Sequence, residues 1–377
     1  MVLERPLRVA LCEPAGRGGI CHYTYALAGA LGAAGADLLL LTSVDYELAE
    51  RPASFAIARV FNRYLTHPIR VLRPLHRFRP DIVHLQTATH PALHLALLGM
   101  ARVGTRAATI VTAHNVLPKA SGRIAALASG MLYRRTHRVI CHAPVLADEI
   151  SQRFRLARSK LAVIPHGDSS HLVEGTVPSA PPNGTPPTML FFGYLHEEKG
   201  LEDLIEALPY VRAAVPESRL VVAGTPEMPI VPLQAQACER GVAAFIDWRL
   251  RYVDSREMHE LFAGTHLVVL PYRRASQSGV ALLAGAFSRP VVATRTGGLS
   301  EVIVHGETGL LVEPHHPREL AEALVEVLKA PERARHLGRT HHERCRGEFS
   351  WVRVAAETVR VYEVALCDGS PAREGAR

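Results

Sequence analysis

The sequence predicts an α/β protein with two doubly wound, parallel-sheet domains that face each other across a cleft. The chain has 377 residues, which at roughly 150 residues per domain is enough for two. Short β-branched or leucine-rich runs alternate with amphipathic stretches, a pattern typical of parallel strands joined by helical crossovers. The alternation stops at a proline-rich segment and then restarts, which indicates a linker between two similar units.

The first domain is expected over residues 1–167. Its strands are expected at Leu7–Cys12, Asp37–Thr42, Asp81–Gln86, Thr109–Ala113, Arg138–His142 and Leu161–Pro165. Helical patterns follow Gly19, cover His90–Arg102 and Arg123–Arg135, and follow Pro144. Because parallel strands need long crossover connections, these segments fit one sheet that is covered by helices on both faces.

The second domain is expected over residues 189–348, after a linker at 168–188 that contains five prolines. Its strands are expected at Met189–Phe192, Leu220–Ala223, Ala244–Asp247, His266–Pro271, Pro290–Thr294 and Gly309–Val312. Its clearest helical patterns are Leu201–Val215, Arg256–Phe262, Pro317–Lys329 and Pro331–Arg346. A terminal helix is expected over 349–367, and the small, polar tail 368–377 is expected to fray.

The formal net charge of +7 conceals a strong asymmetry. Residues 1–167 carry 21 Lys and Arg against 9 Asp and Glu, whereas residues 168–377 carry 22 against 27. Such a basic half attracts anionic lipids or polyanions, although it also fits a basic surface that serves only solubility. We expect no nucleic-acid partner, because no RNA-binding motif, zinc finger or aromatic interleaving accompanies the charge.

Two basic stretches stand out within the first domain. One contains Arg63, Arg70, Arg73, Arg77 and Arg79, and the other contains Arg123, Arg134, Arg135 and Arg138. The second stretch flanks the apolar run Ile124–Leu132, as in helices that lie on a membrane surface. We therefore predict that Arg73, Arg77, Arg123, Arg134 and Arg135 face an anionic membrane or a lipid-linked acceptor.

Cellular location is predicted from three further features. The longest nearly apolar run, 91–101, is about half of a bilayer span, and no apolar signal core precedes the first strand. The six cysteines are scattered and include no CxxC pair, which is typical of a reducing compartment. We expect a cytoplasmic protein that binds peripherally to the inner face of the cell membrane.

Glycine-rich turns follow several predicted strands. The turn Ala15–Ile20 opens the first helix, where backbone N–H groups and the helix dipole favour an anion. Lys199 follows Gly193 at another strand-to-helix turn, so that its ammonium lies beside a helix N-terminus. Two further strand ends carry Ser278-Gly279 and Thr296–Glu301. These features suit phosphate binding at the carboxyl ends of parallel strands.

Together these segments resemble the retaining nucleotide-sugar glycosyltransferases of glycosyltransferase family four, also called glycosyl transferases group 1, which have the GT-B fold. The resemblance covers nearly the whole chain. It rests on Gly18-Gly19, Thr112–Asn115, Val163–Gly167, Gly193 with Lys199-Gly200, Pro290–Ala293, Gly297-Gly298 with Glu301, and Gly306–Val312. It implies two Rossmann-like domains and a terminal helix, starting near Phe349, that crosses back to the first domain.

The resemblance also implies roles for individual residues. His114 would face the donor sugar and Lys199 would hold the diphosphate, so these two are the predicted catalytic residues. The predicted donor-binding residues are Gly18, Gly19, Gly193, Tyr194, Lys199, Ser278, Gly279, Gly297, Gly298 and Glu301. Simpler readings stay open, in which His114 or Glu301 caps backbone groups, Lys199 lies on a helix surface, and Gly297-Gly298 is only a turn.

The sequence departs from the family pattern at three positions. Tyr194 stands where the family commonly has arginine, and Ser276 and Ala284 stand where a pair of glutamates is usual. In the family the first glutamate contacts the donor sugar and the second contacts the ribose. We therefore expect a variant donor site.

The implied reaction transfers a hexosyl unit from a nucleoside diphosphate sugar to a hydroxyl acceptor, with retention. The acceptor is expected to be a lipid-linked glycan or glycolipid, as in polysaccharide biosynthesis. No cofactor is expected, and the absence of a DxD motif predicts a site without metal. The alternatives are a catalytically weak protein that binds sugar nucleotides or membranes, and a GT-B sugar-nucleotide epimerase, which the missing glutamates disfavour.

Overall fold

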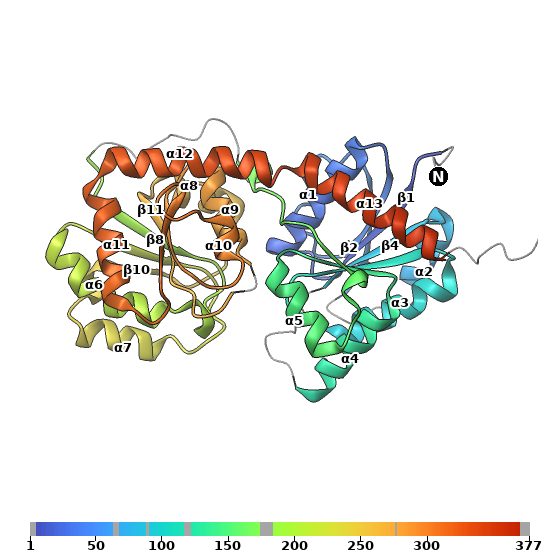
Figure 1. Cartoon of the computed structure of the whole chain (residues 1–377), viewed down its shortest axis with the longest axis horizontal. Helices are drawn as coiled ribbons and strands as arrows, with labels where there is room; N and C mark the ends of the chain where they lie inside the picture. The colour runs from blue at the N-terminus through green and yellow to red at the C-terminus, as the bar shows by residue number, and fades with distance from the viewer. Residues whose placement is uncertain are drawn as a thin grey trace, which may run out of the picture. The chain divides into compact units, whose positions relative to one another are not determined.

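A computed structural model divides the chain into two compact units. Unit 1 comprises residues 1–167 together with 351–377, and unit 2 comprises residues 168–350 (Figure 1). The structure describes residues 5–62, 68–87, 90–116, 122–173, 184–275 and 277–369. Arg63, Ser276, residues 174–183 of the predicted linker and residues 370–377 of the predicted tail therefore lie outside the described residues.

Unit 1 contains a seven-stranded parallel sheet. In chain order its strands are β1 (Arg8–Glu13), β2 (Asp37–Ser43), β3 (Ala56–Phe61), β4 (Ile82–Thr87), β5 (Ala108–Ala113), β6 (Arg138–Cys141) and β7 (Leu161–Val163). The spatial order is β3-β2-β1-β4-β5-β6-β7. The direction of winding therefore reverses between β1 and β4, which is where doubly wound sheets bind ligands.

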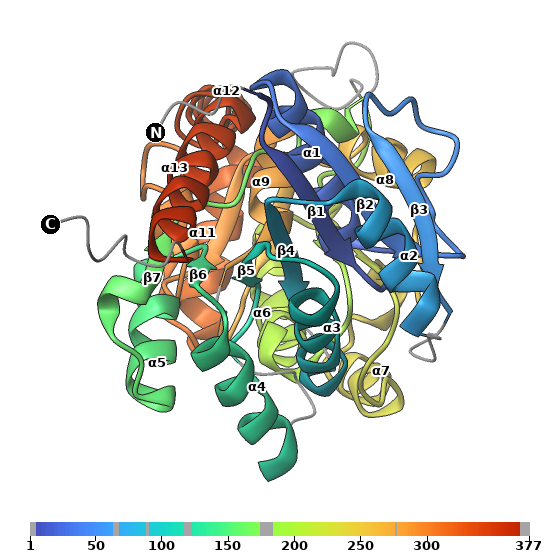
Figure 2. The ribbon, with the colours of Figure 1, turned by 90° about the vertical axis from the view of Figure 1, so that its right-hand side faces the viewer.

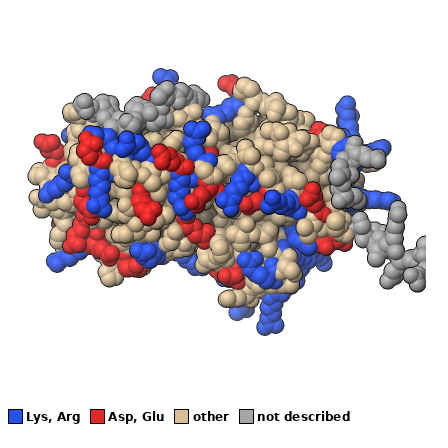
Figure 3. Space-filling view, turned by 45° about the horizontal axis from the view of Figure 1, so that its top comes forward, with Lys and Arg blue, Asp and Glu red and all other residues tan. Residues whose placement is uncertain are grey.

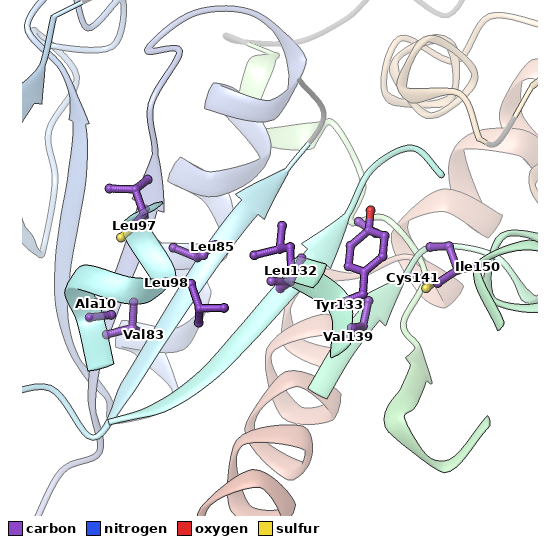
Figure 4. Packing of buried hydrophobic residues seen from close by; sticks show 14 of the residues in the cluster. Ala10, Val83, Leu85, Leu97, Leu98, Leu132, Tyr133, Val139, Cys141 and Ile150 are labelled. Atoms are coloured by element: carbon purple, nitrogen blue, oxygen red, sulfur yellow. The ribbon is translucent and has the colours of Figure 1, made fainter. Parts of the chain in front are cut away.

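Helices cover both faces of this sheet. Against one face pack α2 (Pro68–Phe78), α3 (Pro91–Gly104), α4 (Arg123–Arg135) and α5 (Pro144–Phe154), with a continuous apolar core beneath them (Figure 4). Against the other face pack α1 (Gly19–Ala33) and α13 (Trp351–Gly369). The two helices lie side by side although they are far apart in sequence (Figure 2).

The last helix is therefore part of the first unit. Trp351 begins α13, and its ring packs against Tyr23 of α1 with centroids 5.3 Å apart. A side chain at Gly167 would meet the Trp351 ring at 2.4 Å, so this glycine is required by packing. Asp368 continues the helix, which ends two residues later than the predicted bound of 367.

Unit 2 contains a six-stranded parallel sheet. Its strands are β8 (Thr188–Phe192), β9 (Arg219–Ala223), β10 (Ile246–Arg249), β11 (Leu267–Leu270), β12 (Val291–Thr294) and β13 (Gly309–Val312). The spatial order is β10-β9-β8-β11-β12-β13, so the winding reverses between β8 and β11. Both units are thus doubly wound, as the sequence predicts.

Helices again form two layers. One layer consists of α6 (Leu201–Ala214), α7 (Val231–Glu239) and α11 (Pro317–Lys329), and the other of α8 (Ser255–Ala263), α9 (Gly279–Ala286) and α10 (Leu299–Val302). Each layer covers its own apolar core, the first core under α6, α7 and α11 and the second core under α8, α9 and α10. Helix α12 (Pro331–Glu348) contributes Leu337 to the first core and Cys345 to the second. Residues 168–173 pack in unit 2 as well, where Leu172 and Val173 contact the second core. None of the described helices combines the length and the apolar character that crossing a bilayer requires.

Candidate functional site

The predicted donor-binding segments of the second domain lie at one edge of the unit 2 sheet. Gly193 and Lys199 follow β8, Ser278 and Gly279 follow β11, and the turn 296–301 follows β12. These three strands are neighbours and parallel, so their carboxyl ends share one edge beside the point where the winding reverses. The fold thus brings together loops that are about 100 residues apart in sequence.

Lys199 is held over the end of β8. Its Nζ donates to the carbonyl oxygen of Phe192 at 3.5 Å and lies 5.4 Å from the centroid of the Tyr272 ring. Gly193 adopts a φ of 103°, and a Cβ built there would stand 2.9 Å from Lys199 Nζ. Gly193 therefore permits both the turn and the position of the ammonium group.

Helix α9 begins beside this lysine. Ser278 is its N-cap, and Ser278 Oγ accepts from the backbone N–H of Ala281 at 3.4 Å while donating to Tyr272 Oη at 3.5 Å. Gly279 is the first helical residue. Tyr272 therefore connects the ammonium of Lys199 to the capped helix N-terminus, and both groups stabilise anions.

The glycines of this edge fall into two kinds. A Cβ at Gly200 would stand 2.0 Å from the Pro271 carbonyl oxygen, and one at Gly297 would stand 1.5 Å from the Ala275 carbonyl oxygen. Both residues also have positive φ, so the fold itself requires them. At Gly279 an added Cβ meets nothing within 4 Å. The fold leaves this position open, which suits close approach of a ligand to the backbone.

An ion-pair cluster fixes the loop after β11 against the turn that carries Lys199. Arg273 forms a two-pronged pair with Asp203, with distances of 2.7 and 2.9 Å, and also pairs with Glu202. The backbone N–H of Arg273 donates to the Glu198 carbonyl oxygen at 2.8 Å. Such charge-assisted contacts hold the loop in one geometry.

The remaining predicted donor residues are distributed around this edge. Gly298 precedes α10, and burial raises the pKa of Glu301 within that short helix. Tyr194 is exposed beside Gly193. Ala284 is 0% exposed in the core beneath α9, so its methyl group packs in the protein interior at the position where the resemblance places the second glutamate of the family pattern.

In unit 1 the glycine turn after β1 already binds two carboxylates of its own chain. Glu13 accepts from the N–H groups of Ala15 at 3.0 Å and Gly16 at 2.8 Å, and burial raises the pKa of Glu13 to about 7. Glu47 accepts from the N–H of Gly18 at 2.7 Å. Gly18 has a φ of 77°, so it permits the turn, and its N–H is directed at Glu47.

Gly19 differs from the glycines that precede it. It is the first residue of α1, and a Cβ built on it would meet nothing within 4 Å. At Gly16, in contrast, a Cβ would lie 2.5 Å from the Ser43 Cβ. Gly19 and Gly279 thus occupy corresponding places, each at an open helix start after a strand at the switch point of its sheet.

His114 lies directly after β5 and is almost fully buried, at 5% exposure. Its Nδ1 is 3.2 Å from His142 Nε2, and its Nε2 is 3.0 Å from the side-chain amide of Gln86. The Tyr23 ring packs against both histidines, with centroids 5.0 and 5.1 Å away. Burial, and then the neighbouring histidines, hold the pKa of His114 well below its usual value, so the ring is neutral near pH 7.

The predicted basic residues lie on helices of one layer of unit 1. Arg73 and Arg77 are exposed on α2, and Arg123, Arg134 and Arg135 are exposed on α4. Between the α4 arginines, Ile124 is 81% exposed and Leu127 67%, with Met131 completing the same helix face. Figure 3 shows Lys and Arg groups with few acidic neighbours along the lower margin of unit 1, on the right.

Two family models match the chain. One, described as Glycosyltransferase Family 4, matches residues 17–167, and the other, described as Glycosyl transferases group 1, matches residues 186–330. The glycogen synthase of Mycobacterium tuberculosis strain H37Rv is 30% identical over 296 residues, which span 76% of this chain and 70% of that relative. The chain belongs to glycosyltransferase family 4.

Other relatives agree with this family. The D-inositol 3-phosphate glycosyltransferase of Corynebacterium efficiens is 34% identical over 200 residues, which span 50% of this chain and 46% of the relative. Among solved structures, Anabaena HepE in complex with UDP and glucose matches with a TM-score of 0.77 and 16% identity, over 95% of this chain and 99% of HepE. The sucrose-phosphate synthase of Thermosynechococcus elongatus matches with a TM-score of 0.75 and 19% identity, over 96% of this chain and all of that one. The fold of this glycosyltransferase is therefore GT-B.

Sequence reasoning missed several residues that organise the site of this glycosyltransferase. Tyr272 was not singled out, although it directly follows the strand-ending Pro271. Gln86, His142 and Glu47 were not singled out either, and their partners are 28, 28 and 29 residues away. Only their positions in the sequence could have indicated a role for Gln86 and His142. Each is the last residue of a predicted strand, where ligand-binding side chains of parallel sheets lie. Among the described residues, no cluster of three or more His, Cys, Asp or Glu could hold a metal ion.

Proposed function

We propose that this protein transfers a hexosyl unit from a nucleoside diphosphate sugar to a hydroxyl acceptor, with retention of anomeric configuration and without a metal ion. The observation that carries the proposal is the edge of unit 2, where Lys199 lies beside a capped helix that begins with a glycine the fold does not need. Negative charge grows on the leaving diphosphate as the glycosidic bond breaks. A preorganised ammonium and helix N-terminus stabilise that charge.

The donor class follows from the chemistry of this edge and from the relatives. A diphosphate suits the two anion-stabilising groups, and HepE is described in complex with UDP-glucose. Tyr194 in place of arginine removes one cation, and the buried Ala284 offers no carboxylate to a ribose. We therefore infer that Lys199 and the start of α9 carry more of the diphosphate binding than in relatives with the full pattern.

Retention is proposed without a protein nucleophile. The acceptor hydroxyl attacks the same face of the sugar from which the diphosphate leaves, and a phosphate oxygen of the donor takes the acceptor proton. His114 faces the sugar in this proposal and binds a hydroxyl group. The product anomer, determined by NMR of the freshly formed glycoside, tests retention directly.

The experiment that tests the function is a screen of nucleoside diphosphate sugars by thermal shift, followed by turnover of those that stabilise the protein. We expect one or a few donors to raise the melting temperature and to release nucleoside diphosphate, slowly without acceptor and faster with it. A protein that binds a donor but never releases nucleoside diphosphate would support the non-catalytic alternative. Conversion of the donor into a second nucleotide sugar would support an epimerase.

The acceptor is proposed to be lipid-linked, with the α4 face docking on an anionic membrane. Ile124, Leu127 and Met131 offer apolar side chains that suit insertion among acyl chains, and the flanking arginines suit anionic headgroups, each adding about 1 kcal/mol. This charge pattern favours a lipid bilayer over an apolar protein groove as the occupant. A basic surface that serves only solubility predicts no such binding.

Co-sedimentation with vesicles tests this surface. We expect binding to vesicles that contain phosphatidylglycerol, weaker binding in high salt, and little binding to pure phosphatidylcholine. Replacing Ile124 and Leu127 by serine should weaken binding by at least about tenfold, because two apolar side chains no longer leave water. Val231→Ser is the matched control, since Val231 is 75% exposed on α7 of unit 2. Equal binding of both variants would contradict the α4 surface.

A further inference from the structure

A backbone carbonyl determines which ring nitrogen donates in each of the hydrogen bonds that connect His142 to His114. The Ile164 carbonyl oxygen lies 3.1 Å from His142 Nδ1 and can only accept, so Nδ1 of His142 carries a proton. A neutral imidazole has one N–H, which leaves His142 Nε2 bare. His114 Nδ1 lies 3.2 Å from that bare nitrogen and therefore donates to it.

The same reasoning continues on the other side of His114. With its proton on Nδ1, His114 has a bare Nε2, and the atom that lies 3.0 Å from it is the side-chain oxygen of Gln86. Two acceptors cannot share a hydrogen bond. The two ends of an amide have nearly the same shape, so we assign Gln86 the flipped orientation, with its nitrogen toward His114 and its oxygen toward His84. There, 3.4 Å from the far end of the amide, lies Nε2 of His84, which also reaches Thr112 Oγ1 at 2.7 Å.

The contact between His84 and Tyr362 agrees with this assignment of protons. Tyr362 of α13 lies with its hydroxyl 2.7 Å from His84 Nδ1 and can donate to it, so that His84 keeps its proton on Nε2. Each ring then carries one proton, and the Nε2–H of His84 is shared between Thr112 Oγ1 and the Gln86 oxygen. No ring has to be charged to satisfy its neighbours, and no carboxylate hydrogen-bonds to these rings among the described residues.

Burial supports the neutral pattern. His84, His114 and His142 are all buried, and Tyr23 covers two of them with an aromatic face. Burial lowers the pKa of His142 to about 3 and that of His84 to about 3. A doubly protonated His114 would be an unpaired charge in this environment, which is strongly unfavourable.

We propose that His142 is a positioning residue that fixes His114 in the tautomer with a bare Nε2, so that His114 accepts a hydrogen bond from a substrate hydroxyl in place of the one from Gln86. The substrate hydroxyl rests on the proposed function, whereas the tautomer does not. It follows that His114 neither donates to the substrate nor contributes positive charge to the leaving group.

Ring-nitrogen NMR of the full-length protein, labelled with ¹⁵N-histidine, tests the tautomer. The signals of His114 are identified by their loss in His114→Gln. We expect a protonated Nδ1 and a bare Nε2 in the wild type. In His142→Phe the packing on Tyr23 is retained and the acceptor is lost, so the other tautomer of His114 should appear.

Activity and matched variants separate positioning from packing. His142→Phe should lower kcat by about tenfold with little change in the donor KM, since one orienting hydrogen bond is lost. His142→Gln places an amide oxygen near the lost acceptor and should restore both the spectrum and kcat. His166→Phe is the control, because His166 packs on Tyr23 and His142 but has no hydrogen bond to His114.

Three results would overturn the proposal: a wild-type His114 that is doubly protonated or bare at Nδ1, an unchanged spectrum in His142→Phe, or an equal change in His166→Phe. If His142→Phe does not fold, the wild-type and His142→Gln spectra decide. A wild type that shows the expected tautomer but turns over no nucleotide sugar would refute the proposed function and leave the positioning role intact.

Discussion

Alanine at position 279 tests whether a ligand explains the glycine at the start of α9. The fold leaves room for the methyl group, because a Cβ at Gly279 meets nothing within 4 Å and the residue is not among those with positive φ. Replacing such a glycine stabilises a protein by about 0.4–1 kcal/mol through the unfolded state. For a unit of this size we expect the melting temperature to rise by roughly 1–4 °C.

Whereas its stability should rise, the activity of Gly279→Ala should fall. If the donor diphosphate meets the backbone at the start of α9, the new methyl group displaces it from the helix N–H groups. Charge-assisted hydrogen bonds of this kind contribute about 1.5–3 kcal/mol, so we expect kcat/KM and UDP affinity to fall by roughly 10- to 100-fold. Thermal melts and calorimetric titration with UDP measure the two effects separately.

Gly297→Ala is the contrasting control. Its Cβ would stand 1.5 Å from the Ala275 carbonyl oxygen at a φ of 50°, so the backbone must shift, and we expect a loss of at least about 1–3 kcal/mol in stability. A Gly279→Ala protein that binds UDP like the wild type would refute the placement of the diphosphate at α9. One that melts well below the wild type would refute the claim that the fold leaves this position open.

Three further predictions concern His114, metal and pH. His114→Ala should lower kcat by at least about tenfold while the protein stays folded, and a fully active, folded variant would favour a capping role. Activity should survive EDTA, and complete loss that Mg²⁺ or Mn²⁺ restores would contradict a site whose charge comes from Lys199 and α9. The folded-state pKa of His142 is lowered to about 3, below the unfolded value, so the unfolded state binds the extra proton and stability should fall as pH drops from 6.5 toward 3. In urea melts, His142→Gln should reduce the slope of unfolding free energy against pH by up to about 1.4 kcal/mol per pH unit, and an equal slope in both proteins would place His142 outside the buried network. Glu13, with its pKa raised to about 7, changes stability in the opposite sense as the pH falls, and it does so equally in both proteins.

Much of the fold could be predicted because buried parallel strands are recognisable as apolar runs. The predicted strands of both units are present within a few residues, and Arg123–Arg135 and Pro317–Lys329 match α4 and α11 at both ends. In unit 1 the sequence analysis missed β3 and α2, and in unit 2 it gave no range for α7. Strand β3 lies at the sheet edge with most of its side chains partly exposed, and α2 is rich in Arg and His and contains Pro74.

The site was less predictable, since local sequence does not show which polar groups meet. Glycine turns and Lys199 could be located because a strand end followed by a helix start is a local pattern. That Glu47 binds the Gly18 amide could not be foreseen, because Glu47 belongs to a different loop. The direction of the hydrogen bonds around His114 likewise depends on Ile164, whose carbonyl lies at the end of another strand.

Calorimetric titration with UDP and with UMP tests the central claim most directly, which is that Lys199 and the start of α9 bind the donor diphosphate. The wild type should bind UDP more tightly than UMP, because the second phosphate adds the charge that these groups stabilise. Lys199→Ala should weaken UDP binding by at least about tenfold, whereas Lys329→Ala, on the exposed end of α11, should not change it. Equal affinity of the wild type and Lys199→Ala for UDP would contradict the account.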